Sequence, residues 1–204
     1  MSGMIPNPEK YFGRFIPPKD SLLLELEEEA RTEGIPIVGP VVGQLLHLLA
    51  GAVRAEKILE LGTATGYSTI FLARGCGSRN GTVVTVELDT GMAARARESF
   101  QKAGLDRRIR LEVGDALSLM TDMNGPFDMV FMDIDKEAYL EVLPQCHRLL
   151  RPGGFLVADN VGFSAANKFN RAIFDDSRWE AVHLLSFLPR HSPEKDGLCL
   201  ALRL

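Results

Sequence analysis

The feature that most constrains this chain is a short apolar run followed by two glycines and a helix start, at residues 57–68, with the sequence Lys-Ile-Leu-Glu-Leu-Gly-Thr-Ala-Thr-Gly-Tyr-Ser. The run at 57–61 is typical of a buried strand, and Tyr67 to Leu72 can open a helix. A strand, a glycine turn and a helix start form a ligand-binding crevice in an α/β sheet. The same pattern also occurs as a glycine-rich turn in α/β proteins that bind nothing there.

The glycine spacing and the acid before it narrow the choice of ligand. Gly62 and Gly66 are separated by three residues, whereas a dinucleotide site has Gly-x-Gly-x-x-Gly. The missing third glycine disfavours a nicotinamide dehydrogenase. A carboxylate at Glu60 would repel a pyrophosphate, but it could accept hydrogen bonds from an ammonium group. The stretch therefore favours a cofactor with an amino-acid end.

Strands and helices alternate along the rest of the chain. Residues 1–20 hold several prolines and are predicted to form an extended arm with little regular structure. The predicted helices cover 21–33, 41–53, 92–103, 139–150 and 165–175, and the further strands cover 82–88, 110–113, 127–132, 155–158, 179–188 and 198–204. No repeat or linker interrupts them, which predicts a single α/β domain with an arm and first helix (1–36) and a Rossmann-like core (37–204).

Length, charge and cysteine content exclude several classes of protein. A chain of 204 residues fits one domain, and a formal net charge of -4 does not indicate a general binder of nucleic acids or membranes. The three cysteines lie far apart and form no Cys-x-x-Cys pair, which predicts a reducing cytoplasm. We expect no signal peptide and no membrane span from the distribution of apolar residues.

An acidic residue ends the predicted strand 82–88. In a doubly wound sheet, an acid at the end of the second strand can bind both hydroxyls of a ribose, and it usually lies about 20 residues beyond the glycine turn. Glu87 has this position relative to Gly62. The alternative is a strand-end glutamate that faces solvent.

Oxygen ligands follow the next two strands. Asp133 comes after the strand 127–132, and Asp159 and Asn160 come after 155–158. Two carboxylates and an amide oxygen suit a hard cation such as Mg²⁺, and neighbouring strand ends bring them within reach of each other. Lys136 could then serve as a general base, because a nearby cation makes an ammonium group lose its proton more readily. The alternative for Lys136 is an exposed lysine at a helix start.

Taken together, these motifs resemble the cation-dependent O-methyltransferases, a family that includes catechol and caffeoyl-CoA O-methyltransferases and small bacterial relatives. The resemblance runs from about Ile37 to Leu204, and it is carried by the ordered segments 60–68, 86–87, 114–116, 133–136, 150–154 and 159–160. It implies a Rossmann-like fold of the class I methyltransferases with about seven strands and an antiparallel last strand. It also implies S-adenosylmethionine as cofactor, a divalent cation and a homodimer.

The resemblance also assigns roles to individual residues. The cofactor would contact a set that runs along the strand ends, namely Val38, Glu60, Gly62, Thr63, Tyr67, Ser68, Glu87, Leu88, Asp115, Ala116 and Asp133. Within this set, Glu87 would bind the ribose, and Asp115 and Ala116 would flank the adenine. The cation would be held by Asp133, Asp159 and Asn160, and Lys136 would take the proton from the acceptor hydroxyl.

The chain departs from the family pattern in two places, both where the acceptor should bind. The loop after Asn160 is short, because only 161–168 separate it from Phe169. The segment 188–197 is longer and more polar than the tight turn of relatives, so we expect this late loop to set the choice of acceptor.

Two other functions stay open at this point. One is methylation of a hydroxylated base in tRNA: a recessed site could admit the flipped base, and a local basic patch of Arg14, Lys19, Arg190 and Lys195 could bind the nucleic acid. A sensor that binds S-adenosylmethionine without catalysis is the other alternative. The presence of Lys136 and of all three candidate cation ligands argues against the sensor.

Overall fold

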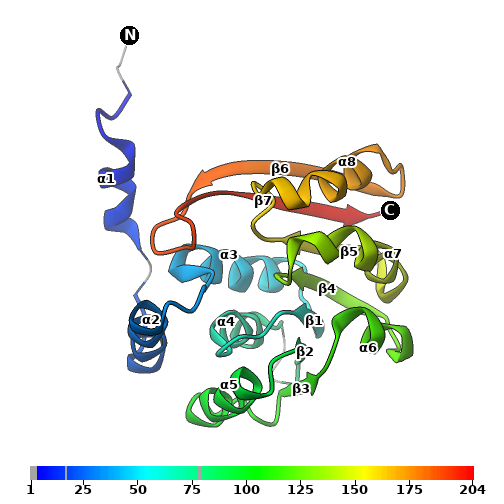
Figure 1. The fold of residues 1–204 in the computed structure, drawn as a ribbon, viewed down its shortest axis with the longest axis horizontal. Helices are drawn as coiled ribbons and strands as arrows, with labels where there is room; N and C mark the ends of the chain where they lie inside the picture. The colour runs from blue at the N-terminus through cyan, green and yellow to red at the C-terminus, as the bar shows by residue number, and fades with distance from the viewer. Residues whose placement is uncertain (1–3, 17, 78–79) are drawn as a thin grey trace.

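A computed structural model describes residues 4–16, 18–77 and 80–204, and its centre is one twisted sheet. Within these residues, seven strands lie in the order β3-β2-β1-β4-β5-β7-β6 (Figure 1). Neighbouring strands run parallel except where β7 pairs with β5 and β6, which is the antiparallel last strand that the resemblance implies. The strands are β1 Lys57–Leu61, β2 Thr82–Glu87, β3 Ile109–Val113, β4 Phe127–Met132, β5 Leu150–Ala158, β6 Trp179–Phe187 and β7 Lys195–Arg203.

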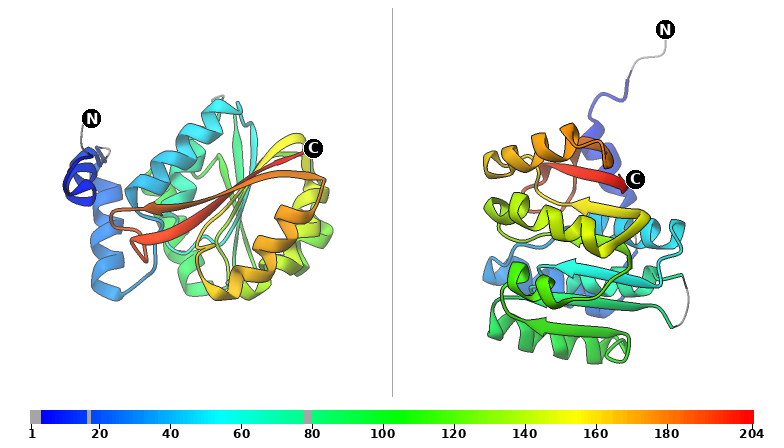
Figure 2. Two further views of the ribbon diagram at one scale, coloured as in Figure 1. Left: turned by 90° about the horizontal axis from the view of Figure 1, so that it is seen from above. Right: turned by 90° about the vertical axis from the view of Figure 1, so that its right-hand side faces the viewer.

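Helices cover both faces of this sheet, as the views of Figure 2 show. The helices are α1 Pro8–Phe12, α2 Ser21–Glu33, α3 Gly39–Ala52, α4 Tyr67–Gly75, α5 Thr90–Lys102, α6 Ala116–Asp122, α7 Tyr139–Leu149 and α8 Asn167–Asp175. Short 3-10 turns cover Gly13–Phe15, Lys136–Ala138 and Ser164–Ala166. Among the described residues, no helix has the length and apolar character that crossing a membrane requires.

Each face of the sheet has its own hydrophobic core. Successive side chains of a strand point to opposite faces, so the apolar run of β1 supplies both cores. Leu59 and Leu61 pack with α6, α7 and α8, whereas Ile58 packs with α2, α3, α4 and α5. Glu60 shares the face of Ile58, so the folding of β1 places a carboxylate inside an otherwise apolar layer.

Several helix starts are fixed by aspartates, which explains why the predicted helix bounds are close to the observed ones. Asp20 caps α2 and Asp89 caps α5, because each carboxylate accepts a hydrogen bond from a backbone N–H in the first turn, at 3.0 and 2.7 Å. Gly34 ends α2 in the left-handed conformation that favours glycine.

The N-terminal arm differs from its prediction. The prolines predict an extended segment, but the arm contains α1 and the 3-10 turn Gly13–Phe15. Asn7 caps α1, and Pro8 occupies a first-turn position where its missing N–H costs nothing. Proline therefore starts a helix here instead of preventing one. Residues 1–3 and 17 of the predicted arm lie outside the described residues.

Two elements after β3 also differ from their predictions. Helix α6 is not among the predicted helices, and its seven residues are capped by Asp115. Strand β5 begins at Leu150, although the sequence predicts a strand only from Phe155. The pairing of β5 with β4 is irregular at this point, where Gly153 has a φ of 69°. Pro152, Gly153 and Gly154 therefore belong to the irregular start of β5 and not to a separate turn before it.

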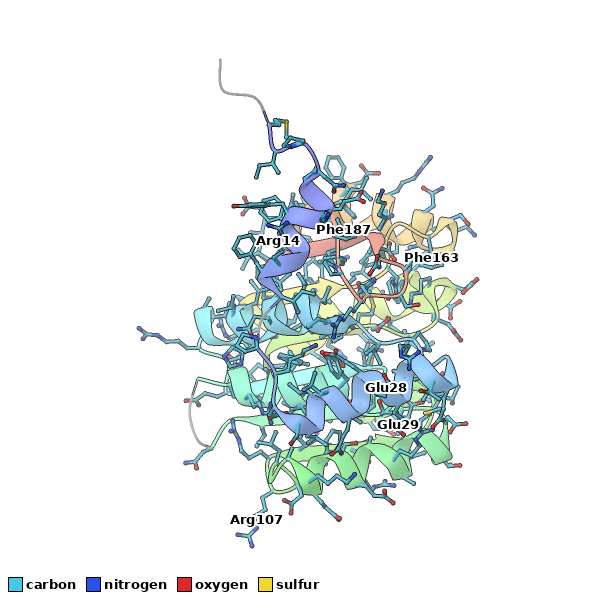
Figure 3. All side chains as sticks on the ribbon, turned by 90° about the vertical axis from the view of Figure 1, so that its left-hand side faces the viewer. Arg14, Glu28, Glu29, Arg107, Phe163 and Phe187 are labelled. Carbon is cyan, nitrogen blue, oxygen red and sulfur yellow. The ribbon has the colours of Figure 1, made fainter. Side chains whose placement is uncertain are left out.

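Most glutamates of α2 lie on the outside of the molecule and form ion pairs, whereas the side chain of Glu27 is largely buried and binds Lys19 and Arg190. Figure 3 shows Glu28 and Glu29 on the outer side of this helix. Glu29 and Glu33 both bind the guanidinium of Arg95, so these ion pairs link α2 to α5. These partly exposed ion pairs each contribute at most about 1 kcal/mol.

Candidate active site

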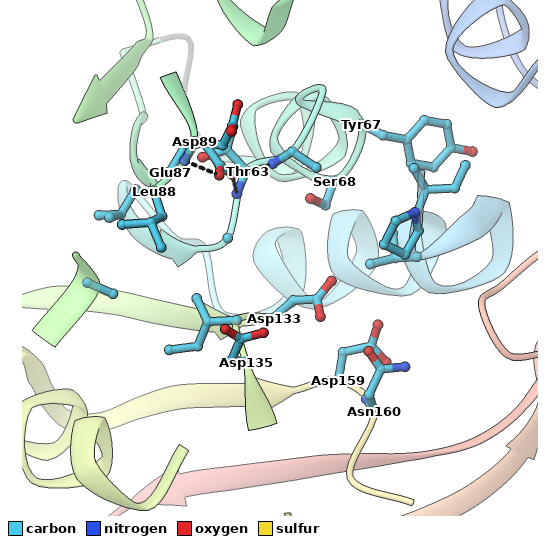
Figure 4. Close-up of a pocket in the computed structure, with 18 of the residues that line it drawn as sticks. Thr63, Tyr67, Ser68, Glu87, Leu88, Asp89, Asp133, Asp135, Asp159 and Asn160 are labelled. Carbon is cyan, nitrogen blue, oxygen red and sulfur yellow. Dashed lines mark hydrogen bonds between the residues drawn. The ribbon is translucent and has the colours of Figure 1, made fainter. Parts of the chain in front are cut away.

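A cavity of about 530 Å³ lies at the carboxyl ends of β1, β2, β4 and β5. Its wall contains every cofactor, cation and base candidate from the sequence except Glu60 (Figure 4). It also contains His191 and Ser192 from the loop between β6 and β7. A volume of this size is typical of a small-molecule or cofactor site.

The glycine turn brings the end of β1 against the end of β4. Gly62 has a φ of +94°, and a Cβ built on it would lie 2.1 Å from the carbonyl oxygen of Asp133. Gly66 has a φ of +87° and packs against the ring of Phe100. Both positions require glycine, since a side chain would meet left-handed backbone strain and occupied space. The turn thereby opens the cavity directly above the start of α4.

Glu60 lies behind the cavity wall. Its side chain is 0% exposed, and its carboxylate accepts hydrogen bonds from the hydroxyls of Ser68 (2.6 Å), Thr85 (2.6 Å) and Thr69. Burial raises the pKa of Glu60 to about 7, the charge of Asp133 adds to this effect, and the three hydroxyls oppose it. Of the described residues that line the cavity, Ser68 is the one whose side chain bonds directly to Glu60.

The raised pKa of Glu60 predicts a pH dependence of stability. The ordinary pKa of this glutamate is 4.5, and its pKa in the folded chain is about 7. Between these two pH values, Glu60 of the folded chain holds a proton that the unfolded chain has released. The free energy of unfolding should therefore fall as pH rises across this window, by roughly 3 kcal/mol. In the variant Glu60→Gln this fall should disappear, while exposed Glu98→Gln should keep it. Urea unfolding measured at several pH values checks the difference, and equal slopes in all three proteins would contradict it.

Glu87 shapes the rim of the cavity. One carboxylate oxygen accepts hydrogen bonds from the N–H groups of Thr63 (3.1 Å) and Ala64 (2.7 Å), as Figure 4 shows for Thr63. The other oxygen accepts from the N–H of Asp89 at 2.9 Å. Glu87 thus fixes the glycine turn and still lines the cavity. Leu88 lies beside it and is largely exposed.

Asp115 and Ala116 lie on the wall at the end of β3. The carboxylate of Asp115 caps α6, because it accepts hydrogen bonds from the backbone N–H and the hydroxyl of Ser118, and these bonds lower the pKa of Asp115. Val38 lies on the wall at the start of α3.

Asp133 and Lys136 form an ion pair inside the cavity. The Lys136 Nζ donates to the Asp133 Oδ1 at 2.9 Å, and both side chains are mostly buried. Burial raises the pKa of Asp133, the charge of Asp159 raises it further, and Lys136 opposes both.

Asp159 and Asn160 are held in place by buried groups that the sequence does not identify. The hydroxyl of Tyr139 donates to the backbone carbonyls of Met132 (3.2 Å) and Asp159 (2.9 Å), so it joins the ends of β4 and β5. The Asn160 amide nitrogen donates to the Asp196 carboxylate at 2.6 Å. Because the carboxylate only accepts, this contact turns the Asn160 amide oxygen away from Asp196.

His191 contacts Asp159, a position that the sequence does not predict. Its Nε2 lies 3.0 and 2.8 Å from the two carboxylate oxygens of Asp159, and its Nδ1 lies 2.6 Å from the carbonyl oxygen of Pro193. Burial acts to lower the pKa of His191, but the hydrogen bonds and charge of Asp159 outweigh it, so the pKa is raised. A lone histidine in a polar loop gives no sequence signal for this contact.

The donors around this point suit a hard cation in their chemistry. Asp133, Asp159 and the amide oxygen of Asn160 are oxygen ligands of the kind that Mg²⁺ and Mn²⁺ prefer. Within the described ranges, no three His, Cys, Asp or Glu side chains are already gathered as a metal cluster. Lys136 and His191 instead pair with the two carboxylates. The oxygen donors therefore suit a cation, while in this structure Lys136 and His191 balance the charges of Asp133 and Asp159.

The predicted basic patch is largely neutralised. Lys19 and Arg190 both bind Glu27, and Lys195 binds Glu9 at 2.7 Å. Arg14 is exposed on the arm. The four cations of the patch thus face two glutamates, which leaves about half of their positive charge for a nucleic acid.

A family model, a curated relative and solved structures that resemble this chain are all described as O-methyltransferases. The family model described as O-methyltransferase matches residues 19–203. A catechol O-methyltransferase of Niastella koreensis is 38% identical over 159 residues, which are 75% of this chain and 72% of that protein.

Two solved structures have the same fold over nearly their whole length. An O-methyltransferase of Bacillus cereus, in complex with SAH, has a TM-score of 0.87 at 31% identity and covers 97% of each chain. An O-methyltransferase of Streptomyces achromogenes involved in tomaymycin synthesis, in complex with SAM, has a TM-score of 0.86 at 30% identity and covers 96% of this chain and 95% of that one. From the matched residues and the shared fold, this chain belongs to the O-methyltransferase family.

Proposed function

We propose that the protein transfers the methyl group of S-adenosylmethionine to a hydroxyl of a small catechol-like or phenolic acceptor, with the help of a divalent cation. The observation that carries this proposal is one cavity that joins the glycine turn, the ribose-binding candidate Glu87 and the cluster of Asp133, Asp159 and Lys136. A cofactor site and an acid–base site share one wall, as a transfer between two bound molecules requires.

The cofactor part of the proposal rests on the end of β1 and the start of α4. Gly62 leaves room for backbone to approach a ligand, and the hydroxyl of Ser68 faces the cavity wall with the Glu60 carboxylate behind it. Glu87 lines the cavity, and three of the roughly four acceptor sites of its carboxylate bind the N–H groups of Thr63, Ala64 and Asp89, which leaves about one for a ribose hydroxyl. S-adenosylmethionine supplies an electrophilic methyl group on sulfur, and the chain's task is to hold it in line with the acceptor oxygen.

The cation part of the proposal rests on Asp133, Asp159 and Asn160. A divalent cation at these residues supplies a positive charge that favours the ionised form of the acceptor hydroxyl. A phenolic hydroxyl has an ordinary pKa of roughly 10 and is a poor nucleophile at neutral pH. The two strand ends hold the carboxylates at fixed positions through Tyr139.

Lys136 is the proposed proton acceptor. Its Nζ is held 2.9 Å from the Asp133 Oδ1 and lies above the ring of Tyr139, 5.7 Å from the ring centroid. These contacts direct the amine into the cavity beside the cation candidates. Without its proton, the Nζ can take the acceptor's hydroxyl proton as the oxygen attacks.

The acceptor class follows from the shape of the late loop and from relatives. The segment after Asn160 is short and turns at once into Ser164–Ala166 and α8, so it does not cover the cavity. His191 and Ser192 line the cavity in its place. The Niastella koreensis relative is named a catechol O-methyltransferase. An ortho-dihydroxy aromatic is therefore the proposed acceptor, whereas the paired charges of the patch give no support to tRNA.

The cation requirement has a direct test. Methyl transfer to a catechol should disappear in EDTA and return when Mg²⁺ or Mn²⁺ is added in excess. Binding of S-adenosylhomocysteine, followed by calorimetry, should persist in EDTA because the glycine turn and Glu87 hold it. Full methyl transfer in EDTA would remove the protein from the cation-dependent group.

We also propose a homodimer formed through the N-terminal arm. The side chains of Tyr11, Phe12 and Phe15 cluster with ring centroids 5.1 to 6.3 Å apart, and Phe12 and Phe15 are 58% and 62% exposed. The arm extends away from the body in Figure 1. Exposed apolar clusters of this kind mark interaction sites.

The arm proposal predicts a change of mass in solution. Replacing both Phe12 and Phe15 by serine should convert a dimer into a monomer in sedimentation velocity. Phe174→Ser removes a similarly exposed phenylalanine from α8 and should leave the mass unchanged. A monomeric unaltered protein, or a dimer that survives the double change, would contradict the proposal.

A further inference from the structure

A second cavity, of about 700 Å³, adjoins the candidate active site. Residues of α2 and of the loop after it line this second cavity, together with Arg190 from the loop between β6 and β7. Pro36, Ile37 and Ser192 line both cavities, so the two meet at these residues. An acceptor whose ring lies beside the cation candidates can therefore extend a substituent into the second cavity.

The backbone of Arg190 is held in an unusual conformation at this junction. Its φ of 66° is left-handed, which costs a non-glycine residue about 1 to 2 kcal/mol. The loop lies against the start of α3 (Figure 1), where a Cβ built on Gly39 would lie 2.7 Å from the Arg190 carbonyl oxygen. The Arg190 N–H also donates to the Glu194 carboxylate at 2.9 Å. Backbone strain that is maintained by such contacts is common at functional sites.

The side chain of Arg190 carries a positive charge that its partner does not fully balance. The Glu27 carboxylate accepts hydrogen bonds from Lys19 (2.6 Å), the Tyr67 hydroxyl (2.6 Å) and Arg190 (2.8 Å). Burial alone would raise the pKa of Glu27, but these three donors outweigh it, so the pKa is lowered and the carboxylate is ionised. Two cations thus share one anion. The side chains of Lys19 and Glu27 are 6% and 9% exposed and that of Arg190 is 56% exposed, so the excess charge faces outward on Arg190.

The Arg190 guanidinium also has hydrogen-bond donors to spare. A guanidinium has five N–H donors, and among the described residues Arg190 uses its Nη1 alone, on Glu27. Its Nε and Nη2 remain, and this edge matches the two oxygens of a carboxylate. Arg31, which lines the same cavity, already uses its Nε and Nη2 on the Glu28 carboxylate. Arg190 is therefore the arginine of this cavity that can take a further anion.

We propose that Arg190 binds a carboxylate of the acceptor, so that the preferred acceptor is an ortho-dihydroxy aromatic with a carboxylate on its side chain, an inference that rests on the function proposed above. The ring would lie beside Asp159 and Lys136, and the side chain would pass Ile37 and Ser192 to reach the guanidinium. One excess positive charge matches a singly charged carboxylate better than a doubly charged phosphate. Because this contact is remote from the reacting oxygen, it stabilises the ground state and the transition state alike and lowers KM.

Steady-state methyl transfer to a matched pair of acceptors tests the role of Arg190. The pair is an ortho-dihydroxyphenyl propanoate and its uncharged amide, each with S-adenosylmethionine and Mg²⁺. In the unaltered protein the acid should have a KM lower by about tenfold or more, with a similar kcat. Arg190→Gln should remove this preference, and Arg190→Lys, which keeps the charge without the fork, should retain part of it. Arg31→Gln is the matched control and should retain all of it.

The outcomes separate this inference from the function beneath it. Equal KM values for acid and amide in the unaltered protein would overturn the role of Arg190 and leave the proposed function standing, even if no variant folds. A preference that survives in Arg190→Gln, or one that disappears in Arg31→Gln, would also overturn that role. Transfer to neither acceptor would overturn the proposed function itself.

Discussion

Replacing Lys136 by alanine should lower kcat for methyl transfer by about 10² to 10⁴, the usual range for the loss of a general base. The Nζ is the proposed base, held within the cavity beside Asp133, and alanine removes it. Affinity for S-adenosylhomocysteine should change little, because the glycine turn and Glu87, which would hold the cofactor, stay unchanged. Steady-state kinetics and calorimetry measure the two quantities separately.

Lys136→Arg separates proton transfer from simple charge pairing. Arginine can still pair with Asp133, but it stays protonated at neutral pH and cannot act as a base. Both variants should therefore be impaired to a similar extent in kcat. An arginine variant that keeps most of the activity would show that Lys136 acts through its charge, and a loss confined to KM would show a binding role.

The substitution Gly62→Ala should destabilise the fold by roughly 3 kcal/mol or more, and it should also abolish cofactor binding. Overpacking costs about 1 to 3 kcal/mol, and left-handed backbone costs a non-glycine residue about 1 to 2 kcal/mol more. The added methyl group would lie 2.1 Å from the Asp133 carbonyl oxygen, so the ends of β1 and β4 must separate. Urea unfolding and calorimetry with S-adenosylhomocysteine provide the measurements.

Gly104→Ala isolates the steric part of this effect. Gly104 has a φ of +66°, but a Cβ there would meet nothing within 4 Å. This variant should lose only the stability that left-handed backbone costs a non-glycine residue, about 1 to 2 kcal/mol, and it should keep its cofactor affinity. If Gly62→Ala is no less stable than Gly104→Ala, the close approach of the two strand ends does not constrain the site as described.

The acidic residues of the cavity wall that the sequence predicts follow from the rule for strand ends. Buried strands have strong periodic signals, and the carboxyl ends of parallel strands must meet at one edge of the sheet. This rule alone predicts that Glu87, Asp133 and Asp159 share one edge, and all three line the cavity. Glu60 shows the limit of the rule: its place in β1 is predictable, but side-chain alternation directs it behind the wall.

The parts that the sequence does not predict depend on loops and on contacts between distant segments. His191 meets Asp159 only because the β6–β7 loop folds back over the cavity, and no local pattern encodes such a return. Tyr139 joins two strand ends from α7, where a buried tyrosine looks like any core residue. The short helix α1 escapes prediction because its signals, Asn7 and Pro8, also suit an extended segment.

Transfer of a methyl group from S-adenosylmethionine to an oxygen atom is the reaction assigned to this cavity. Its most direct test is to incubate the purified protein with Mn²⁺, an ortho-dihydroxy aromatic and S-adenosylmethionine that carries a ¹³C-labelled methyl group, and to examine the product by NMR. We expect the label on one of the two hydroxyl oxygens, with transfer by Lys136→Ala slower by about 10² to 10⁴. A label on carbon or nitrogen, or equal transfer by Lys136→Ala, would contradict the account.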